Sequence, residues 1–136
     1  MEESISKRKI VGTLRHRLVL LIDQYKPSER QLLQNALSRA EEIHEDQYRR
    51  AIIVSVKRGL PYIAHPMRVA LIIMEELEVK DIVAIAGALL HDVVEAKRKK
   101  ISIADIEKDF GRSIAMMVSI LTRPEVEAAA TEEEKR

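Results

Sequence analysis

The chain of 136 residues has no cysteine, no tryptophan, one phenylalanine, four glycines and four prolines. The absence of cysteine excludes a disulfide framework, a zinc–thiolate site and thiol catalysis, and it fits a reducing compartment. Glycine and proline are the residues that most often mark turns, so their scarcity favours long helices over a turn-rich β fold. We therefore expect an all-α protein of the cytoplasm.

The sequence also lacks an excess of charge of one sign and a long apolar run. The chain carries 23 basic and 22 acidic residues, and a net charge of +1 is too small for a nucleic-acid binder that depends on neutralising phosphates. The longest apolar run, Ile82–Leu90, is too short to cross a bilayer. With 46% hydrophobic residues, we expect a soluble protein with one domain over residues 1–123 and a polar tail or terminal helix over 124–136.

Apolar residues recur at the three- and four-residue spacing of a helix in six segments. The predicted helices cover about residues 7–25, 28–44, 66–77, 82–94, 102–110 and 114–121. The fourth segment is apolar on almost every side, which is typical of a helix in the middle of a domain. The short apolar run over residues 51–56 is consistent with either a strand or a helix. The fold class is therefore an all-α bundle of about six helices.

Residues that cap helices support several of these boundaries. The segment from Ser28 to Gln31 has the pattern of a capping box and would open the second helix. Asp81 is placed to cap the fourth helix, and Ser102 with Asp105 resembles a second capping box. Gly111 is expected to end the fifth helix, because glycine tolerates a positive φ.

An adjacent histidine and aspartate, His91 and Asp92, lie near the end of the most apolar predicted helix. Burying an imidazole and an ionised carboxylate is costly unless they are paired or bind a cation. On a helix, Glu95 would lie beside both of them, at spacings of four and three residues. His65, at the start of the preceding helix, could reach across from a neighbouring element. Nitrogen and carboxylate ligands without sulfur suit Mn²⁺, Fe²⁺ or Zn²⁺.

Simpler interpretations of these histidines stay open. A buried histidine that is only hydrogen-bonded to a neighbouring aspartate is common, and His65 at a helix start could act as a partial cap. His16 lies between two arginines and is expected to be solvated. His44 lies on the apolar face of the second predicted helix, where a packed core histidine is more common than a metal ligand.

Several motifs resemble the alarmone-hydrolase domain of RelA/SpoT proteins and their small stand-alone relatives. The two longest are GLPYIAHPMRVA over residues 59–70 and ALLHDVVE over residues 88–95. IADIEKDFG over 103–111 and LTR over 121–123 continue the similarity in order, and residues 40–50 resemble the helix that leads into the domain. The resemblance covers about residues 25–123. It implies an HD-superfamily helical fold that hydrolyses the 3′-pyrophosphate of (p)ppGpp, usually with Mn²⁺.

The resemblance also implies roles for particular residues. It makes His65, His91 and Asp92 metal ligands and Glu95 the catalytic residue. Basic residues in the loop before the HP motif of that family contact the nucleotide, which implies a guanine nucleotide with a 3′-diphosphate as the binding partner. The candidates for that contact are Lys57 and Arg58, followed by Arg49 and Arg50.

The chain departs from the family pattern at two points that bear on turnover. Ala96 follows Glu95, where the family has an aspartate, and the family's fourth metal ligand, an aspartate in a later motif resembling LADR, has no counterpart in these 136 residues. A second hypothesis is therefore a degenerate HD module that binds a nucleotide or a protein partner with weak or no turnover. Homo-oligomerisation stays open. A helix-turn-helix DNA binder is disfavoured, because the basic residues are scattered over several elements.

Overall fold

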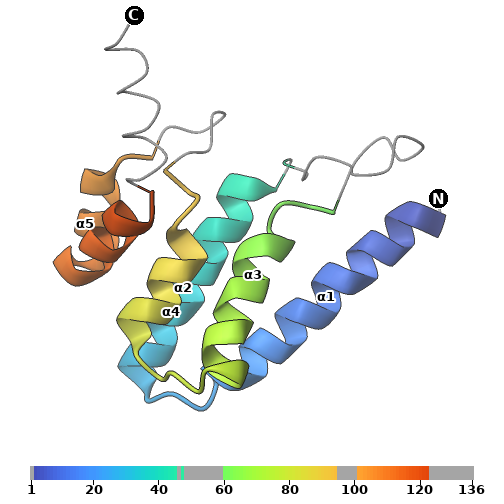
Figure 1. The fold of residues 1–136 in the computed structure, drawn as a ribbon, viewed down its shortest axis with the longest axis horizontal. Coiled ribbons are helices and arrows are strands. Elements are labelled where there is room, and N and C mark those ends of the chain that lie inside the picture. The colour runs from blue at the N-terminus through green and yellow to red at the C-terminus, as the bar shows by residue number, and fades with distance from the viewer. Residues whose placement is uncertain (1, 46, 48–59, 95–100, 123–136) are drawn as a thin grey trace, which may run out of the picture.

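The computed structural model describes residues 2–45, 47, 60–94 and 101–122. Within these ranges the chain is helical and contains no β-strand, as predicted (Figure 1). The elements are α1 (Glu2–Ile22), α2 (Pro27–His44), α3 (Ala64–Leu71), the π-helical turn η1 (Ile72–Glu76), α4 (Ile82–Leu90), α5 (Ile103–Phe110) and a last helix over residues 112–122. None of the described helices is both long and apolar enough to traverse a lipid bilayer.

The helices pack side by side, with α3 between α1 and α4 and with α4 against α2 (Figure 1). The last helix and α5 lie on the other side of α2 and α4 from α1. All residues from Ile85 to Leu90 are buried, which confirms that this segment lies in the middle of the domain. Each α-helix contributes fully enclosed side chains to the core. They include Leu18, Ile22, Leu33, Met67, Ile85, Leu89, Ile106 and Val118.

Three of the predicted helix ends are confirmed by hydrogen bonds or backbone angles. The carboxylate of Asp81 accepts from the Val83 N–H at 2.9 Å, which caps α4. Ser102 and Asp105 form a reciprocal capping box at the start of α5. Gly111 ends α5 with a φ of +94°, a conformation that residues with a Cβ rarely adopt.

Other boundaries differ from the prediction. The capping box at Ser28 is wrong, since α2 begins at Pro27 and its N-cap, Lys26, makes no side-chain capping bond. Proline suits the first helical position because its φ is preset and it needs no hydrogen-bond acceptor there. The helix predicted to reach residue 94 ends at Leu90, after which the Val93 N–H donates to the Leu90 carbonyl in a tighter turn. The first helix begins at Glu2 and ends at Ile22, about a turn before its predicted end.

The last helix approaches α4 closely at Gly87. A Cβ added at this glycine would overlap with Cγ of Met117, far inside van der Waals contact. The missing side chain therefore lets the helix over residues 112–122 pack directly on α4. At Gly12, on α1, no atom of the described residues lies within 4 Å of the same position.

We expect Gly87→Ala and Gly12→Ala to change stability in opposite directions. Alanine at position 87 overpacks the contact with Met117 and should lower the free energy of unfolding by about 1–3 kcal/mol. Alanine at position 12 removes only the conformational entropy of a helical glycine, and it should raise the free energy of unfolding by about 0.5–1 kcal/mol. Urea denaturation of both variants measures this. Equal effects, or no relief of Gly87→Ala by Met117→Ala in the same chain, would contradict the proposed contact.

Candidate metal centre

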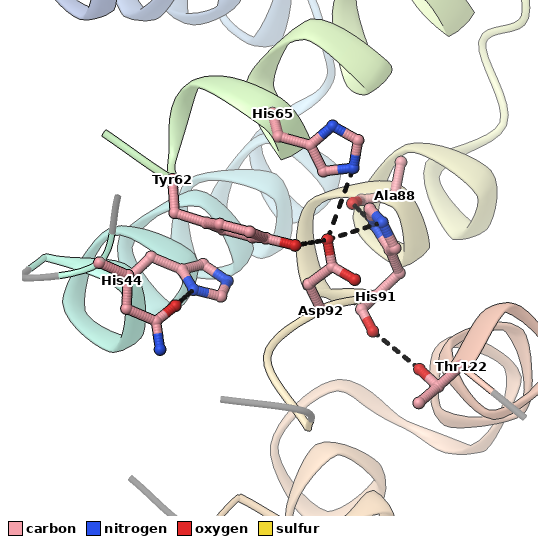
Figure 2. Close-up of polar contacts among 8 residues, drawn as sticks. His44, Tyr62, His65, Ala88, His91, Asp92 and Thr122 are labelled. Carbon is pink, nitrogen blue, oxygen red and sulfur yellow. Dashed lines mark hydrogen bonds and ion pairs between the residues drawn. The ribbon is translucent and has the colours of Figure 1, made fainter. Parts of the chain in front are cut away.

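The side chains of His65, His91 and Asp92 meet at one end of the bundle (Figure 2). His65 comes from the first turn of α3, and the other two come from the turn that follows α4. One ligand atom from each of the three side chains lies within 4.8 Å of the other two. Oδ2 of Asp92 is 3.0 Å from Nε2 of His91 and 3.5 Å from Nε2 of His65. The structure thus brings together the two histidines and the aspartate that were singled out as candidate ligands.

A hydrogen bond orients the imidazole of His91. Its Nδ1 lies 2.6 Å from the carbonyl oxygen of Ala88. A carbonyl can only accept, so Nδ1 carries the proton and, in the neutral ring, Nε2 carries the lone pair. That lone pair faces the carboxylate of Asp92, which is also an acceptor. Two acceptors held 3.0 Å apart need a cation between or beside them, either a proton on the ring or a metal ion.

The carboxylate of Asp92 is stabilised in its charged form. Burial, the largest single influence, raises the pKa of Asp92, but a hydrogen bond and positive charge from a protonated His91, a hydrogen bond from Tyr62 and positive charge from a protonated His65 outweigh it, so that this pKa lies below its ordinary value. The hydroxyl of Tyr62 donates to Oδ2 at 2.7 Å. The carboxyl group is therefore an anion at neutral pH although it is largely buried.

His44 lies next to Tyr62 and is enclosed by protein, as expected for a packed core histidine. Its side chain is 1% exposed, and Nδ1 lies 2.7 Å from Oε1 of Gln47. The ring contacts that of Tyr62, with centroids 4.8 Å apart (Figure 2). Nε2 of His44 has no hydrogen-bond partner among the described residues. Burial lowers the pKa of His44 and outweighs the hydrogen bond to Gln47 and the charge of Asp92, which both raise it.

Two residues support the group although no sequence pattern indicated their role: Tyr62 and Thr122. The buried hydroxyl of Thr122 donates to the carbonyl oxygen of His91 at 2.7 Å, which ties the last helix to the turn after α4. Both residues lie inside motifs that resemble the alarmone hydrolases. The motifs alone did not indicate which atoms these hydroxyls would contact, because both contacts join segments about 30 residues apart in the chain.

The remaining residues with predicted roles lie outside the described part of the chain. They are the catalytic candidate Glu95 with its neighbour Ala96, the nucleotide-binding candidates Arg49, Arg50, Lys57 and Arg58, and the apolar run over residues 51–56.

The donor set fits a divalent cation of the first transition row. Two imidazole nitrogens and one carboxylate oxygen, with no sulfur, suit Mn²⁺, Fe²⁺ or Zn²⁺. Among the residues that the structure describes, no fourth histidine or acidic side chain joins the group. Three protein ligands would leave coordination positions for water or for an oxygen of a substrate.

The comparisons with known proteins define the class of the chain. A family model described as "HD domain" matches residues 36–136, so the chain belongs to the HD domain family. Guanosine-3′,5′-bis(diphosphate) 3′-pyrophosphohydrolase MESH1 of Danio rerio is 41% identical over 64 residues, which are 47% of this chain and 34% of that protein. Its Homo sapiens counterpart is 39% identical over 64 residues, or 47% and 35% of the two chains.

A longer match extends to a bacterial protein. The bifunctional (p)ppGpp synthase/hydrolase SpoT of Escherichia coli (strain K12) is 37% identical over 100 residues, which are 72% of this chain and 12% of that protein. The matched region therefore spans about a third or less of the length of these relatives. The resemblance to the RelA/SpoT family that the motifs indicated is confirmed.

We expect Thr122→Val to destabilise the protein, because it removes the hydrogen bond to His91 while keeping the side-chain shape. Loss of such a bond from a buried donor should lower the free energy of unfolding by about 1–2 kcal/mol. Thr13→Val is the matched control: the hydroxyl of Thr13 donates to the Lys9 carbonyl on the exposed side of α1, and its loss should change stability by less than about 0.5 kcal/mol. Urea denaturation without metal compares the two, and equal effects would show that the Thr122 bond does not hold the turn.

We also expect His44 to make the protein less stable in acid. Its pKa in the folded protein is lower than the ordinary 6.5, so the unfolded chain binds the proton more readily. The stability due to the neutral imidazole is complete above pH 6.5 and is lost as the pH falls below it. His44→Asn should be less stable at pH 8 but lose less stability on acidification. Unfolding free energies from pH 8 to pH 5 in chelator test this, and parallel curves would disprove it.

Proposed function

We propose that this chain is a metal-dependent phosphohydrolase that removes the 3′-diphosphate of (p)ppGpp. The observation that carries the proposal is the convergence of His65, His91 and Asp92 at one end of the bundle. The relatives support the choice of substrate, because MESH1 is named as a 3′-pyrophosphohydrolase of guanosine-3′,5′-bis(diphosphate) and SpoT as a (p)ppGpp synthase/hydrolase.

In this proposal His65, His91 and Asp92 hold one divalent cation, and Mn²⁺ is the ion that the family resemblance implies. When bound, the cation supplies positive charge that makes a water more acidic and offsets the charge on the attacked phosphoryl group. The hydrogen bond from Nδ1 of His91 to Ala88 fixes the tautomer that a ligand through Nε2 requires. Asp92 contributes a negative charge that is present at neutral pH.

The remaining steps are assigned to side chains outside the described residues. Glu95 would orient the attacking water and accept its proton as it adds to the phosphorus next to the 3′ oxygen. Basic side chains would hold the diphosphate by charge-assisted hydrogen bonds, and the candidates are Lys57, Arg58, Arg49 and Arg50. Cleavage of the bond between that phosphorus and the 3′ oxygen releases pyrophosphate and leaves GDP or GTP.

Ala96 favours a second candidate function. A methyl group can neither relay a proton nor hold a water, although the resemblance implies an aspartate at this position. A chain that binds the metal and the nucleotide but does not turn over would be a binding module of the HD family. Nucleotide binding without release of pyrophosphate distinguishes it from the hydrolase.

We expect the wild-type chain to release pyrophosphate from (p)ppGpp in the presence of Mn²⁺, and Asp92→Asn to lower the rate by about 100-fold or more, because it removes the only carboxylate among the described candidate ligands. Chromatography of the nucleotide product, with a coupled pyrophosphate assay, measures both. Asp109→Asn is the control, since Asp109 pairs with Arg39 at 2.8 Å on a partly exposed surface and its loss should leave the rate within about twofold.

Three results would separate the alternatives. GDP or GTP as product supports 3′ cleavage, whereas a product that keeps its 3′-diphosphate contradicts it. Equal rates for Asp92→Asn and the wild type would exclude the proposed metal centre from the reaction. Binding of (p)ppGpp with no pyrophosphate at any Mn²⁺ concentration would exclude the hydrolase and leave the binding module.

A further inference from the structure

Tyr62 contacts the candidate metal centre without belonging to the ligand set. It precedes α3 by two residues, and its hydroxyl donates to Oδ2 of Asp92 at 2.7 Å. This is the same oxygen that faces Nε2 of His91 and Nε2 of His65. Figure 2 shows the phenol approaching the carboxylate from one side and the two imidazoles from others.

The lone pairs of the carboxylate allow a hydrogen bond and a metal ion at the same time. A carboxylate oxygen has two lone pairs, and an ionised carboxylate can accept about four bonds in all. The Tyr62 hydroxyl occupies one direction at Oδ2, and the sector toward the two imidazoles remains for a cation. The phenol therefore restrains the orientation of the Asp92 carboxylate without blocking its side toward the histidines.

Tyr62 is itself held in place by a residue at the C-terminal end of α2 and by a residue that follows this helix. Its backbone N–H donates to the carbonyl oxygen of Gln47 at 2.8 Å, and the side chain of Gln47 contacts Nδ1 of His44. The His44 ring packs against the Tyr62 ring at 4.8 Å and a tilt of 40°. On the other side, the ring of His65 meets that of Tyr62 edge-on at 5.9 Å. With neighbours on two sides, the phenol is fixed relative to the carboxylate.

We propose that Tyr62 is a positioning residue for the metal centre: its hydroxyl holds the Asp92 carboxylate in the orientation that a divalent cation requires. The inference rests on the proposed metal site, but it does not depend on which phosphate ester is hydrolysed. Removing a residue that donates a hydrogen bond to a metal ligand commonly weakens metal affinity by about 10–100-fold. The role is carried by one hydroxyl, so it can be tested without disturbing the ring.

The test is the affinity of the metal-free full chain for Mn²⁺, measured by calorimetry for the wild type, Tyr62→Phe and Tyr25→Phe. Tyr62→Phe keeps the ring between His44 and His65 and removes only the donor, and it should bind Mn²⁺ about 10–100-fold more weakly. Tyr25→Phe is the matched control, because the Tyr25 hydroxyl donates to the Lys80 carbonyl at 3.2 Å, away from the site. It should bind Mn²⁺ as the wild type does.

A second readout separates positioning from folding. With saturating Co²⁺ in place of Mn²⁺, Tyr62→Phe should change the visible absorption of the bound ion, since the carboxylate ligand is less restrained, while Tyr25→Phe should not. Circular dichroism in chelator should show both variants folded. Unfolding of Tyr62→Phe in chelator would overturn the proposal, because the hydroxyl would then serve the fold and not the metal.

The remaining outcomes distinguish this inference from the proposed function. Wild-type and Tyr62→Phe chains with equal Mn²⁺ affinity and equal Co²⁺ spectra would overturn the role of Tyr62 and leave the hydrolase proposal intact. Weaker Mn²⁺ binding by Tyr62→Phe supports the inference even where no pyrophosphate is released from (p)ppGpp. A wild-type chain that binds neither ion would overturn the metal centre, and the role of Tyr62 with it.

Discussion

The negative charge on Asp92 has to be compensated inside a bundle whose other buried side chains are almost all apolar. Moving a carboxylate out of water is costly unless donors or cations surround it. Here the polar neighbours of the carboxylate are the hydroxyl of Tyr62, which donates to it, and the imidazoles of His65 and His91. When His91 is neutral and in the tautomer that Ala88 requires, its Nε2 cannot donate to the carboxylate, and a divalent cation is well suited to supply the missing positive charge.

The packing of the helices brings these side chains together. The helix α4 is apolar on nearly all sides and is therefore covered by its neighbours, which leaves the turn after Leu90 as the place where its polar residues emerge. Helix α3 packs against α4 and places His65 opposite that turn. The last helix comes close to α4 at Gly87, and its Thr122 binds the backbone of His91. Elements from most of the bundle thus converge on two consecutive residues.

Much of this arrangement could be predicted from the sequence, because it depends on local patterns. Apolar periodicity located the helices, and Asp81, Ser102 and Gly111 marked ends that depend on short-range hydrogen bonds or on one backbone angle. The convergence of His65 with His91 and Asp92 was expected from the family motifs together with the cost of burying the pair. Local patterns failed at Ser28, since the preset φ of Pro27 began the helix one residue earlier.

The contacts that sequence reasoning did not find are tertiary. The hydroxyls of Tyr62 and Thr122 reach atoms about 30 residues away, and the choice of acceptor follows from how α3 and the last helix pack on α4. The end of α4 at Leu90 was not predicted either, and just beyond it the carbonyl of His91 accepts a hydrogen bond from Thr122. Periodicity carries no information on such contacts, and the geometry of the packed helices was needed to find them.

The most direct test of the metal centre is pulsed electron paramagnetic resonance of the Mn²⁺-loaded chain with ¹⁵N-labelled histidine imidazoles. The account predicts hyperfine coupling to two directly bound imidazole nitrogens, one from His65 and one from His91, and coupling to a single nitrogen when either histidine is replaced by alanine. Bound Mn²⁺ without imidazole coupling, or a coupling pattern that neither replacement alters, would contradict it.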